Sequence, residues 1–428
     1  MIYLASQNVK SHKKLASPDA KMAKKLTTED VEELFETSNR QIRDESSTFH
    51  RYLMAEIDWR DRLICIKGPR GIGKTTLMRQ YVKDTFGEDS QQAVYASLDD
   101  LWFARHSLKD FVAYLYEHGF THVFLDEVHH LGREWSLQMK NIADQFRKMN
   151  IVYSGSSLLQ LEKAQGDLSR RQATYMLEGM SFREYLKLEG LLDFNALTIE
   201  ELLADHVNIA SRIDKELKVL PHFESYLKCG YYPFYRESNA KFRERLVETV
   251  NKVLEFDYPA IDDVSQDTIR KTRKMLMVLA ESCPQTPNMS ALYRELETGR
   301  DQGLKMLKAL QRAGLLAPVD SKSRKLDDLS KPEKIYVNNT NLMHALVPRV
   351  DLGVARETFF FNQAKKDHVV TYTGVGDFVV DGKWTFEVGG KGKGYDQIAD
   401  VPNSFVVNDG VSVGHGKKIP LWLFGFLY

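Results

Sequence analysis

Apolar residues follow two alternating patterns between residues 62 and 186. Four short apolar runs are rich in the β-branched and aromatic residues that strands favour, and they lie at residues 63–66, 93–98, 122–125 and 151–153. Stretches with apolar residues at helical spacing separate the runs, at residues 75–85, 108–118 and 135–149. This alternation predicts an α/β fold in which helices cover a parallel sheet.

The pattern differs on either side of this region. Residues 9–26 are rich in Lys, Ser and Ala and indicate a solvated arm, with nucleic-acid contact as the alternative. A helix capped by Thr28 is expected next.

The rest of the chain divides into three stretches. Residues 187–265 carry no strand signal and are predicted to be helical, while residues 266–337 predict three helices and a hairpin. Residues 350–428 predict one helix followed by short strands, and the final LWLFGFLY is expected to be a buried closing strand.

Composition narrows the class of protein. Lys plus Arg number 59 and Asp plus Glu also number 59, which excludes a globally basic nucleic-acid coat and a globally acidic tail protein. Three scattered cysteines exclude a disulfide scaffold and a cysteine-rich zinc site. No apolar run is long enough to cross a bilayer, and the first residues lack the apolar core of a secretory signal. We therefore expect a cytoplasmic protein without a membrane segment.

The strongest motif matches G-x-x-x-x-G-K-[ST] between an apolar run and a predicted helix. Its residues are Gly68, Pro69, Arg70, Gly71, Ile72, Gly73, Lys74, Thr75 and Thr76. Glycines let backbone N–H groups converge on phosphate oxygens, and the helix N-terminus adds a positive dipole end. Lys74 is predicted to reach the β- and γ-phosphates, and the Thr75 hydroxyl to ligate Mg²⁺.

Acidic and hydroxyl side chains follow the next predicted strands. Asp126 is the candidate second Mg²⁺ partner, acting through water, and Glu127 is the candidate base that polarises the attacking water. Ser154, with Ser156 as second choice, is expected to sense the γ-phosphate, and a helix cap is the alternative role.

Two further side-chain pairs follow these acids in the sequence. Arg170 or Arg171 would offset charge on the γ-phosphate, in the same chain or toward a neighbouring subunit, unless both are surface residues. His129 and His130 follow the acids, but consecutive histidines share no helix face, and a metal other than Mg²⁺ is not favoured.

The order of motifs resembles the prokaryotic AAA-type ATPases of the ASCE P-loop division. The stretches that carry this resemblance are GPRGIGKTTLMRQY, VFLDEVHHL, YSGSSLL, MSFREYL, GYYPFY and KIYVNNTNLMHAL, together with the tail from residue 350. It implies an arm and helix (1–47), an ATPase core (48–186), a helical lid (187–265), a winged helix (266–337) and a PD-(D/E)xK nuclease-like domain (338–428).

The resemblance also implies a lid turn near the adenine. Gly230 and Pro233 match this turn, and a helix stop is the alternative. In the predicted winged helix, Lys305, Lys308 and Arg312 share one exposed face. The wing adds three more basic residues, Lys322, Arg324 and Lys325. DNA contact through this patch competes with a plain packing role.

In the nuclease-like tail, Asp377 and Glu387 match the two metal-binding acids that the resemblance implies, but Gly389 stands at the lysine position. Lys391 or Lys393 would have to reach back, and Gln397 lies where a helix would face the site. We therefore expect a degenerate nuclease fold used for binding or packing, rather than an active nuclease.

Together these features predict an Mg²⁺-dependent ATPase that acts as a nucleotide-driven switch on its C-terminal modules. An ATP-regulated DNA-binding protein or nuclease is the alternative. ATP is favoured because no Asn-Lys-x-Asp guanine-reading motif is present. Candidate partners are the nucleotide, DNA through the winged helix, a protein partner and further copies of the chain.

Overall fold

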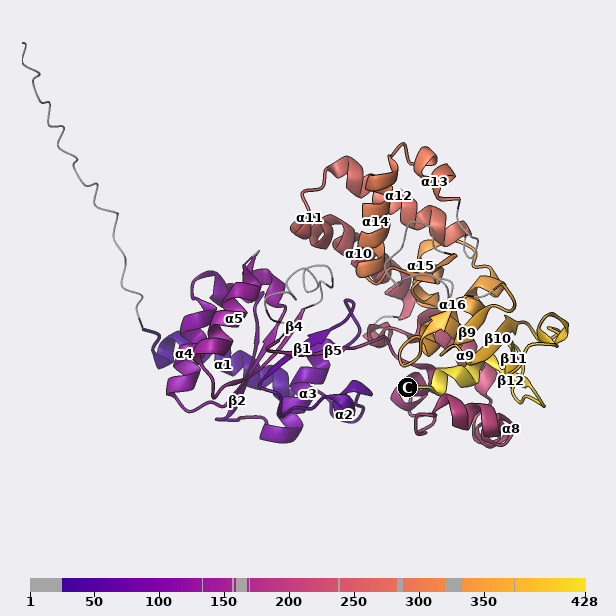
Figure 1. The fold of residues 1–428 in the computed structure, drawn as a ribbon. Helices are drawn as coiled ribbons and strands as arrows, with labels where there is room; N and C mark the ends of the chain where they lie inside the picture. Colours follow the sequence, from indigo (N-terminus) through magenta and orange to yellow (C-terminus); the bar gives the residue numbers. More distant parts are fainter. Residues whose placement is uncertain are drawn as a thin grey trace, which may run out of the picture.

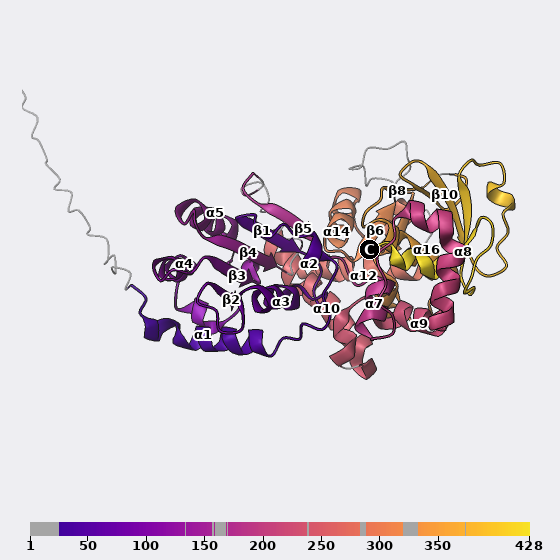
Figure 2. The same cartoon turned by 90° about the horizontal axis from the view of Figure 1, so that it is seen from below.

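The computed structural model describes residues 25–132, 134–155, 158, 168, 170–237, 239–282, 288–319, 333–372 and 374–428. Figures 1 and 2 show the indigo to purple region on one side of the molecule and the orange to yellow region on the other. Among the described residues, no helix combines the length and the apolar character that a membrane crossing requires.

The first of these regions is built on five parallel strands in the order β2-β3-β4-β1-β5. The strands are β1 (Leu63–Lys67), β2 (Ala93–Ser97), β3 (His122–Asp126), β4 (Asn150–Gly155) and β5 (Ala173–Met176). Four of them were predicted; β5 was not, because its half-exposed edge position leaves no apolar run.

Helices cover both faces of this sheet (Figure 1). They are α1 (Thr28–Arg43), α2 (Leu53–Glu56), α3 (Lys74–Phe86), α4 (Leu108–Glu117) and α5 (Trp135–Gln145), with short turns η1 (Leu101–Ala104) and η2 (Val128–Leu131). Successive residues of β1 enter opposite cores, Ile64 and Ile66 on one face and Leu63 and Cys65 on the other. The N-cap of α1 is Thr27 rather than the predicted Thr28, since Thr27 completes a capping box with Asp30.

The middle of the chain is helical, as expected. Its longer elements are α7 (Phe182–Leu188), α8 (Ile199–Glu216), α9 (Val219–Ser225), α10 (Phe242–Lys252) and α11 (Tyr258–Ile261). Between them lie the π-helical turns η3 (Tyr226–Gly230) and η6 (Val253–Asp257) and the 3-10 turns η4 (Pro233–Glu237) and η5 (Asn239–Lys241).

Three helices and a hairpin come next, as the pattern predicted. They are α12 (Gln266–Ser282), α13 (Met289–Glu295), α14 (Arg300–Arg312), β6 (Leu316–Val319) and β7 (Lys334–Val337). Lys305, Lys308 and Arg312 are exposed on α14. The predicted wing residues Lys322, Arg324 and Lys325 lie outside the described residues, as does Ser156.

The tail contains a second sheet in the order β12-β11-β10-β9-β8. Its elements are α15 (Thr340–Leu346), α16 (Leu352–Ala364), β8 (Val370–Thr371), β9 (Phe378–Val380), β10 (Trp384–Gly389), η7 (Asp396–Ile398), β11 (Ser404–Asn408) and β12 (Lys418–Pro420). The strand pairs β8/β9 and β9/β10 are antiparallel, and β10/β11 and β11/β12 are parallel.

The predicted closing strand is wrong. Residues Leu421–Phe426 form the 3-10 helix η8 instead. Pro420 ends β12 because it lacks a ladder N–H. Every residue of η8 is buried, and Gly425 lies directly against Phe182 and Phe359, whereas a strand with one solvated face would alternate.

Candidate functional site

The phosphate-binding motif forms the loop that joins β1 to α3. Gly68, Gly71 and Gly73 have φ angles of 156°, 80° and 95°, which other residues rarely adopt. Space is limiting as well, since a Cβ on Gly71 would lie 2.7 Å from the ring of Phe234 in η4. The loop is therefore curled, and Phe234 of η4 lies directly against it.

Lys74 begins α3 and is buried inside the loop. Its Nζ donates hydrogen bonds of 2.9 Å to the carbonyl oxygens of Gly68 and Pro69. Burial lowers the pKa of Lys74 to about 8, against the opposing effect of Glu127 and Asp126. An anionic ligand in this loop would favour the charged ammonium.

Asp126, at the end of β3, is held by four donors. Oδ2 accepts hydrogen bonds from the Thr75 hydroxyl (2.5 Å) and the Tyr95 hydroxyl (2.9 Å). Oδ1 accepts from the Ser154 hydroxyl and from the Glu127 N–H. Since parallel strands end at the same edge of the sheet, residues far apart in sequence meet here. The structure thus brings together Thr75, Asp126 and Ser154, three of the candidate site residues.

Tyr95 was not anticipated. It belongs to β2, whose apolar run gives no sign of a polar role. Only the register of β2 against β3 reveals this role. It pairs Tyr95 with Phe124, which lies two residues before Asp126.

Glu127 adopts a left-handed conformation, with φ of 56° and ψ of 44°. Its carboxylate lies 3.1 Å from Nδ1 of His129, a buried ring. Burial lowers the pKa of His129 to about 4, with the nearby positive charges of His130 and Arg70 acting in the same direction. His129 is therefore neutral near pH 7, and the Glu127 side chain lies beside a neutral ring.

A cavity of about 500 Å³ lies beside the phosphate loop and Glu127. One wall consists of Glu127 and six loop residues, Arg70, Gly71, Gly73, Lys74, Thr75 and Thr76. The opposite wall includes Pro233, Phe234 and Lys252 from the middle helical segment. The predicted loop residues Lys74, Thr75 and Thr76 therefore share one cavity with Glu127 and Pro233. Gly230 is not among its lining residues, and a Cβ there would meet the ring of Tyr226 at 2.4 Å.

Arg70 connects the loop to the middle segment. Its Nη2 lies 2.9 Å from Oδ1 of Asp257 in η6 and 3.5 Å from Nε2 of His129. Asp257 is 4% exposed, so this pair is largely shielded from solvent. No motif marks Asp257, and only the fold reveals its role.

The two candidate arginines lie apart from these groups. Arg171 forms an ion pair with Asp144 of α5, both arginines are exposed, and neither lines the cavity. The geometry does not favour a role for Arg170 or Arg171 in the same chain, and a role toward a neighbouring subunit stays a prediction.

Comparison with known families addresses the nature of this region. Residues 60–186 match the family model of an AAA domain. This region is therefore similar to AAA domains. The five-stranded parallel sheet and the loop between β1 and α3 agree with that assignment, and the predicted P-loop NTPase fold is confirmed. Residues 220–356 match a domain of unknown function (DUF8612). No curated protein matches the chain.

Several solved structures are similar to the chain at low identity. A Walker-type ATPase of Pyrococcus abyssi has 12% identity and a TM-score of 0.38, over 73% of this chain and 95% of its own. The ORC1 protein of Aeropyrum pernix, solved in complex with DNA, has 12% identity and a TM-score of 0.28, over 74% and 91%. The Hsp104–ADP complex of S. cerevisiae has 14% identity and a TM-score of 0.26, over 66% and 39%. At TM-scores below 0.5, these similarities say nothing about the ligands of this chain.

A second cluster of charged side chains lies in the tail. Lys334, at the start of β7, places its Nζ 2.9 Å from Oε2 of Glu357 on α16 and 3.3 Å from Oδ1 of Asp377. The hydroxyl of Tyr336 also donates to Glu357, at 2.6 Å. A single ammonium group thus lies between two carboxylates.

The remaining predicted acid of the tail has its own lysine. Glu387 forms an ion pair with Lys393, which also bonds Gln397 at 2.6 Å. A Cβ on Gly389 would lie 2.7 Å from the Lys393 side chain, so Lys393 occupies the space that a lysine at position 389 would need. Among the described residues, no three His, Cys, Asp or Glu side chains form a group that could hold a metal ion. Each of the two predicted acids, Asp377 and Glu387, is thus paired with a lysine.

Proposed function

We propose that the chain binds ATP together with Mg²⁺ in the cavity between the phosphate loop and residues 233–252, and that it hydrolyses the bond to the γ-phosphate. The observation that supports this proposal most is the meeting of Lys74, Thr75 and Glu127 on one cavity, with Asp126 bonded to Thr75 behind them. Phosphoryl transfer requires a cation for the phosphates, oxygen ligands for Mg²⁺ and an acid beside the attacking water. Lys74, Thr75 with Asp126, and Glu127 supply these groups in turn.

Each group has a separate task in this mechanism. Lys74 and the loop N–H groups bind the phosphate oxygens. Thr75 Oγ1 and Asp126 Oδ2, which lie 2.5 Å apart, are oxygen donors of the kind that Mg²⁺ prefers, and the ion supplies neutralising charge to the phosphates. Glu127 orients a water molecule and accepts its proton. Ser154 holds the Asp126 carboxylate through a hydrogen bond to Oδ1.

The middle helical segment, residues 187–265, acts in this proposal as a lid. Phe234 lies against Gly71, and Arg70 pairs with Asp257 in the same segment. Nucleotide binding that shifts the loop therefore also shifts the lid and the C-terminal modules behind it.

The test combines binding and turnover. Lys74→Ala should weaken MgATP binding at least tenfold by calorimetry, because one buried charged contact is lost. Glu127→Gln should keep binding and lower kcat by about a hundredfold or more, since the proton acceptor is lost. Glu117→Gln, an exposed acid on α4 paired with Lys25, serves as the control. Absence of binding heat with folded wild-type protein would overturn the proposal, and normal turnover by Glu127→Gln would overturn the role of Glu127.

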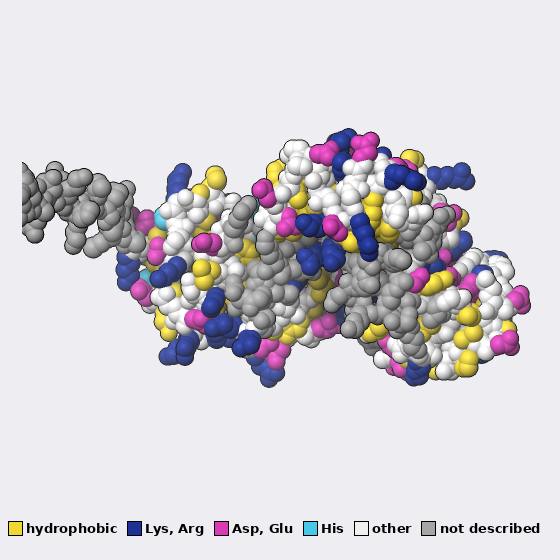
Figure 3. Space-filling view, turned by 45° about the horizontal axis from the view of Figure 1, so that its top comes forward, with side chains coloured by type: hydrophobic (Ala, Val, Ile, Leu, Met, Phe, Trp, Pro, Cys, Tyr) yellow, Lys and Arg dark blue, Asp and Glu magenta, His cyan; other side chains and the backbone are white. Residues whose placement is uncertain are grey.

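DNA binding is a second candidate function, favoured by the exposed basic residues of α14. On the face drawn in Figure 3, however, Lys and Arg side chains lie in separate groups with acidic side chains between them. If α14 contacts DNA, the double variant Lys305→Gln with Lys308→Gln should weaken duplex binding. The slope of log K against log salt concentration should then fall by the amount expected for about two lost phosphate contacts. Binding that is equally tight and equally salt-dependent in this variant would exclude that role.

A further inference from the structure

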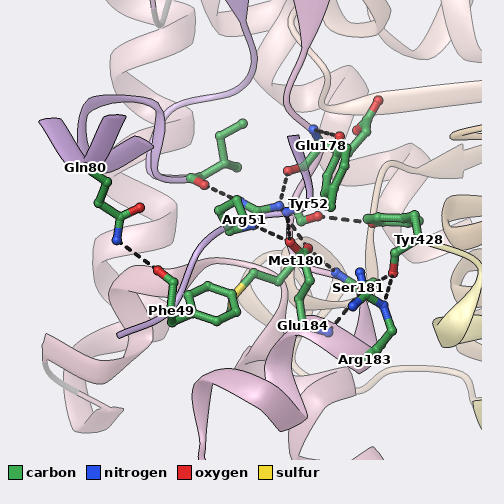
Figure 4. A network of polar contacts seen from close by, with 12 residues as sticks. Phe49, Arg51, Tyr52, Gln80, Glu178, Met180, Ser181, Arg183, Glu184 and Tyr428 are labelled. Carbon is green, nitrogen blue, oxygen red and sulfur yellow. Dashed lines mark hydrogen bonds and ion pairs between the residues drawn. The ribbon is translucent and has the colours of Figure 1, made fainter. Parts of the chain in front are cut away.

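Arg51 lies between α1 and α2, outside every motif found in the sequence, and yet its side chain is only 3% exposed. Its guanidinium bonds both oxygens of Glu184 on α7, at 3.0 and 3.2 Å. The same group donates to two backbone carbonyls, at 2.5 Å to Ile72 and 2.7 Å to Glu178. Figure 4 shows Arg51 at the centre of this network.

The bond to Ile72 has a consequence for the phosphate loop. Ile72 is inside the motif, and its carbonyl belongs to the same peptide unit as the N–H of Gly73, which lines the cavity. In a trans peptide the C=O and the following N–H point in opposite directions. A donor that fixes the carbonyl on one side therefore fixes the direction of the N–H on the other.

The ion pair itself is fully satisfied. Besides Arg51, the Glu184 carboxylate accepts from the backbone N–H of Tyr52 at 2.6 Å and of Ser181 at 3.2 Å. Buried charges with complete hydrogen bonding hold one geometry, and losing one partner leaves the other uncompensated. Arg51 is thus held rigidly enough to impose an orientation on the loop.

The other end of the network holds the C-terminal segment. Ser181 Oγ and Arg183 Nε donate to the backbone oxygen of Tyr428, at 2.7 and 2.8 Å. The ring of Tyr428 lies edge-on to that of Tyr52, with 5.1 Å between centroids. Ser181 also caps α7, the helix that carries Glu184. The phosphate loop, through Arg51, and the C-terminal segment, through Tyr428, are therefore connected to the same short helix (Figure 4).

We propose that Arg51 is a positioning residue for the nucleotide, aiming the Gly73 N–H at the phosphate chain and making that aim depend on the docking of residues 421–428 onto α7. This inference rests on the proposed binding of ATP. It assigns a route from the nucleotide to the C-terminal modules that runs through Arg51 and Glu184, separate from the Arg70–Asp257 contact with the lid.

The test uses variants that keep part of the network. Arg51→Lys retains a charge for Glu184 but is unable to reach Ile72 and Glu178 as well. It should weaken MgATP and MgADP binding at least tenfold, while circular dichroism stays that of the wild type. Arg62→Lys is the matched control, because Arg62 also donates to a carbonyl of the same domain, that of Ala143, away from the loop.

Two outcomes separate this inference from the proposed function. If the wild type binds no nucleotide, the proposed function fails. If the wild type binds and Arg51→Lys binds equally well, only this inference fails. Glu184→Gln gives a second route to the same answer if Arg51→Lys does not fold, and it should weaken binding as Arg51→Lys does.

The unity of the network is tested by combining variants. Arg51→Lys with Glu184→Gln should bind nucleotide no more weakly than the poorer single variant, because both changes break one unit. Multiplicative losses would contradict this. Arg183→Gln, which removes a donor to Tyr428, should raise the dissociation constants three- to tenfold. Unchanged constants would show that docking of the C-terminal segment has no influence on the loop.

Discussion

Lys334→Met tests the idea that one lysine holds two carboxylates together in the tail. The Nζ lies 2.9 Å from Glu357 and 3.3 Å from Asp377, and the three side chains are 13%, 15% and 17% exposed. Breaking a buried ion pair costs about 3–5 kcal/mol because the remaining charge is uncompensated. Partial exposure screens the charges, so we expect a loss of about 2–3 kcal/mol in the free energy of unfolding.

The loss should depend on pH in a defined direction. Burial, followed by the charge of Asp377, raises the pKa of Glu357 above its ordinary value, and removing Lys334 raises this pKa further. A carboxyl whose folded pKa exceeds its unfolded pKa destabilises the fold as pH rises and the group ionises. The penalty of Lys334→Met should therefore be smaller near pH 5 than near pH 7.5.

Urea unfolding at both pH values measures these effects. Lys383→Met is the control, since Lys383 is 55% exposed and lies 3.8 Å from Glu200, a pair worth less than about 1 kcal/mol. Adding Glu357→Gln to Lys334→Met should restore part of the stability by removing one of the facing charges. A Lys334→Met penalty equal to that of the control, or one that grows toward pH 5, would refute the reasoning.

Two further predictions concern the nucleotide site. Tyr95→Phe removes one of four donors to Asp126 and should lower kcat by about three- to tenfold in a steady-state ATPase assay. Its unfolding midpoint should stay close to that of the wild type. An unchanged kcat would show that the hydroxyl is dispensable. Gly71→Ala places a methyl group against the ring of Phe234 at a residue whose φ is 80°. It should lower the free energy of unfolding by about 1–3 kcal/mol in urea and weaken ATP binding. Tight ATP binding by this variant would show that the lid moves independently of the loop.

The sequence was most informative where chemistry is local. The phosphate loop needs glycines, a lysine and a threonine within nine consecutive residues, so one motif locates it. Asp126 and Glu127 follow an apolar strand, and the parallel order of strands places them at the same edge. Strand and helix periodicity likewise located four of the five strands of the first sheet.

The predictions failed or fell short where long-range packing decides. Residues 421–428 have the composition of a buried strand, and only their contact with α7 and α16 shows why a tightly packed 3-10 helix forms instead. Arg51 and Asp257 have no distinguishing neighbours in sequence. Their partners are 133 and 187 residues away, so no window of sequence contains both members of either pair.

Lys334 shows why the charge of a residue does not determine its role. A lysine beside a predicted basic wing would be assigned by composition to phosphate contact, like Lys322 and Arg324. In the structure, its ammonium turns inward to the two carboxylates of Glu357 and Asp377, which come from the following domain. This internal cation therefore pairs with two acids, of which Asp377 belongs to the nuclease-like pattern expected from the sequence. These ion pairs join the hairpin to α16 and to Asp377, the residue before β9.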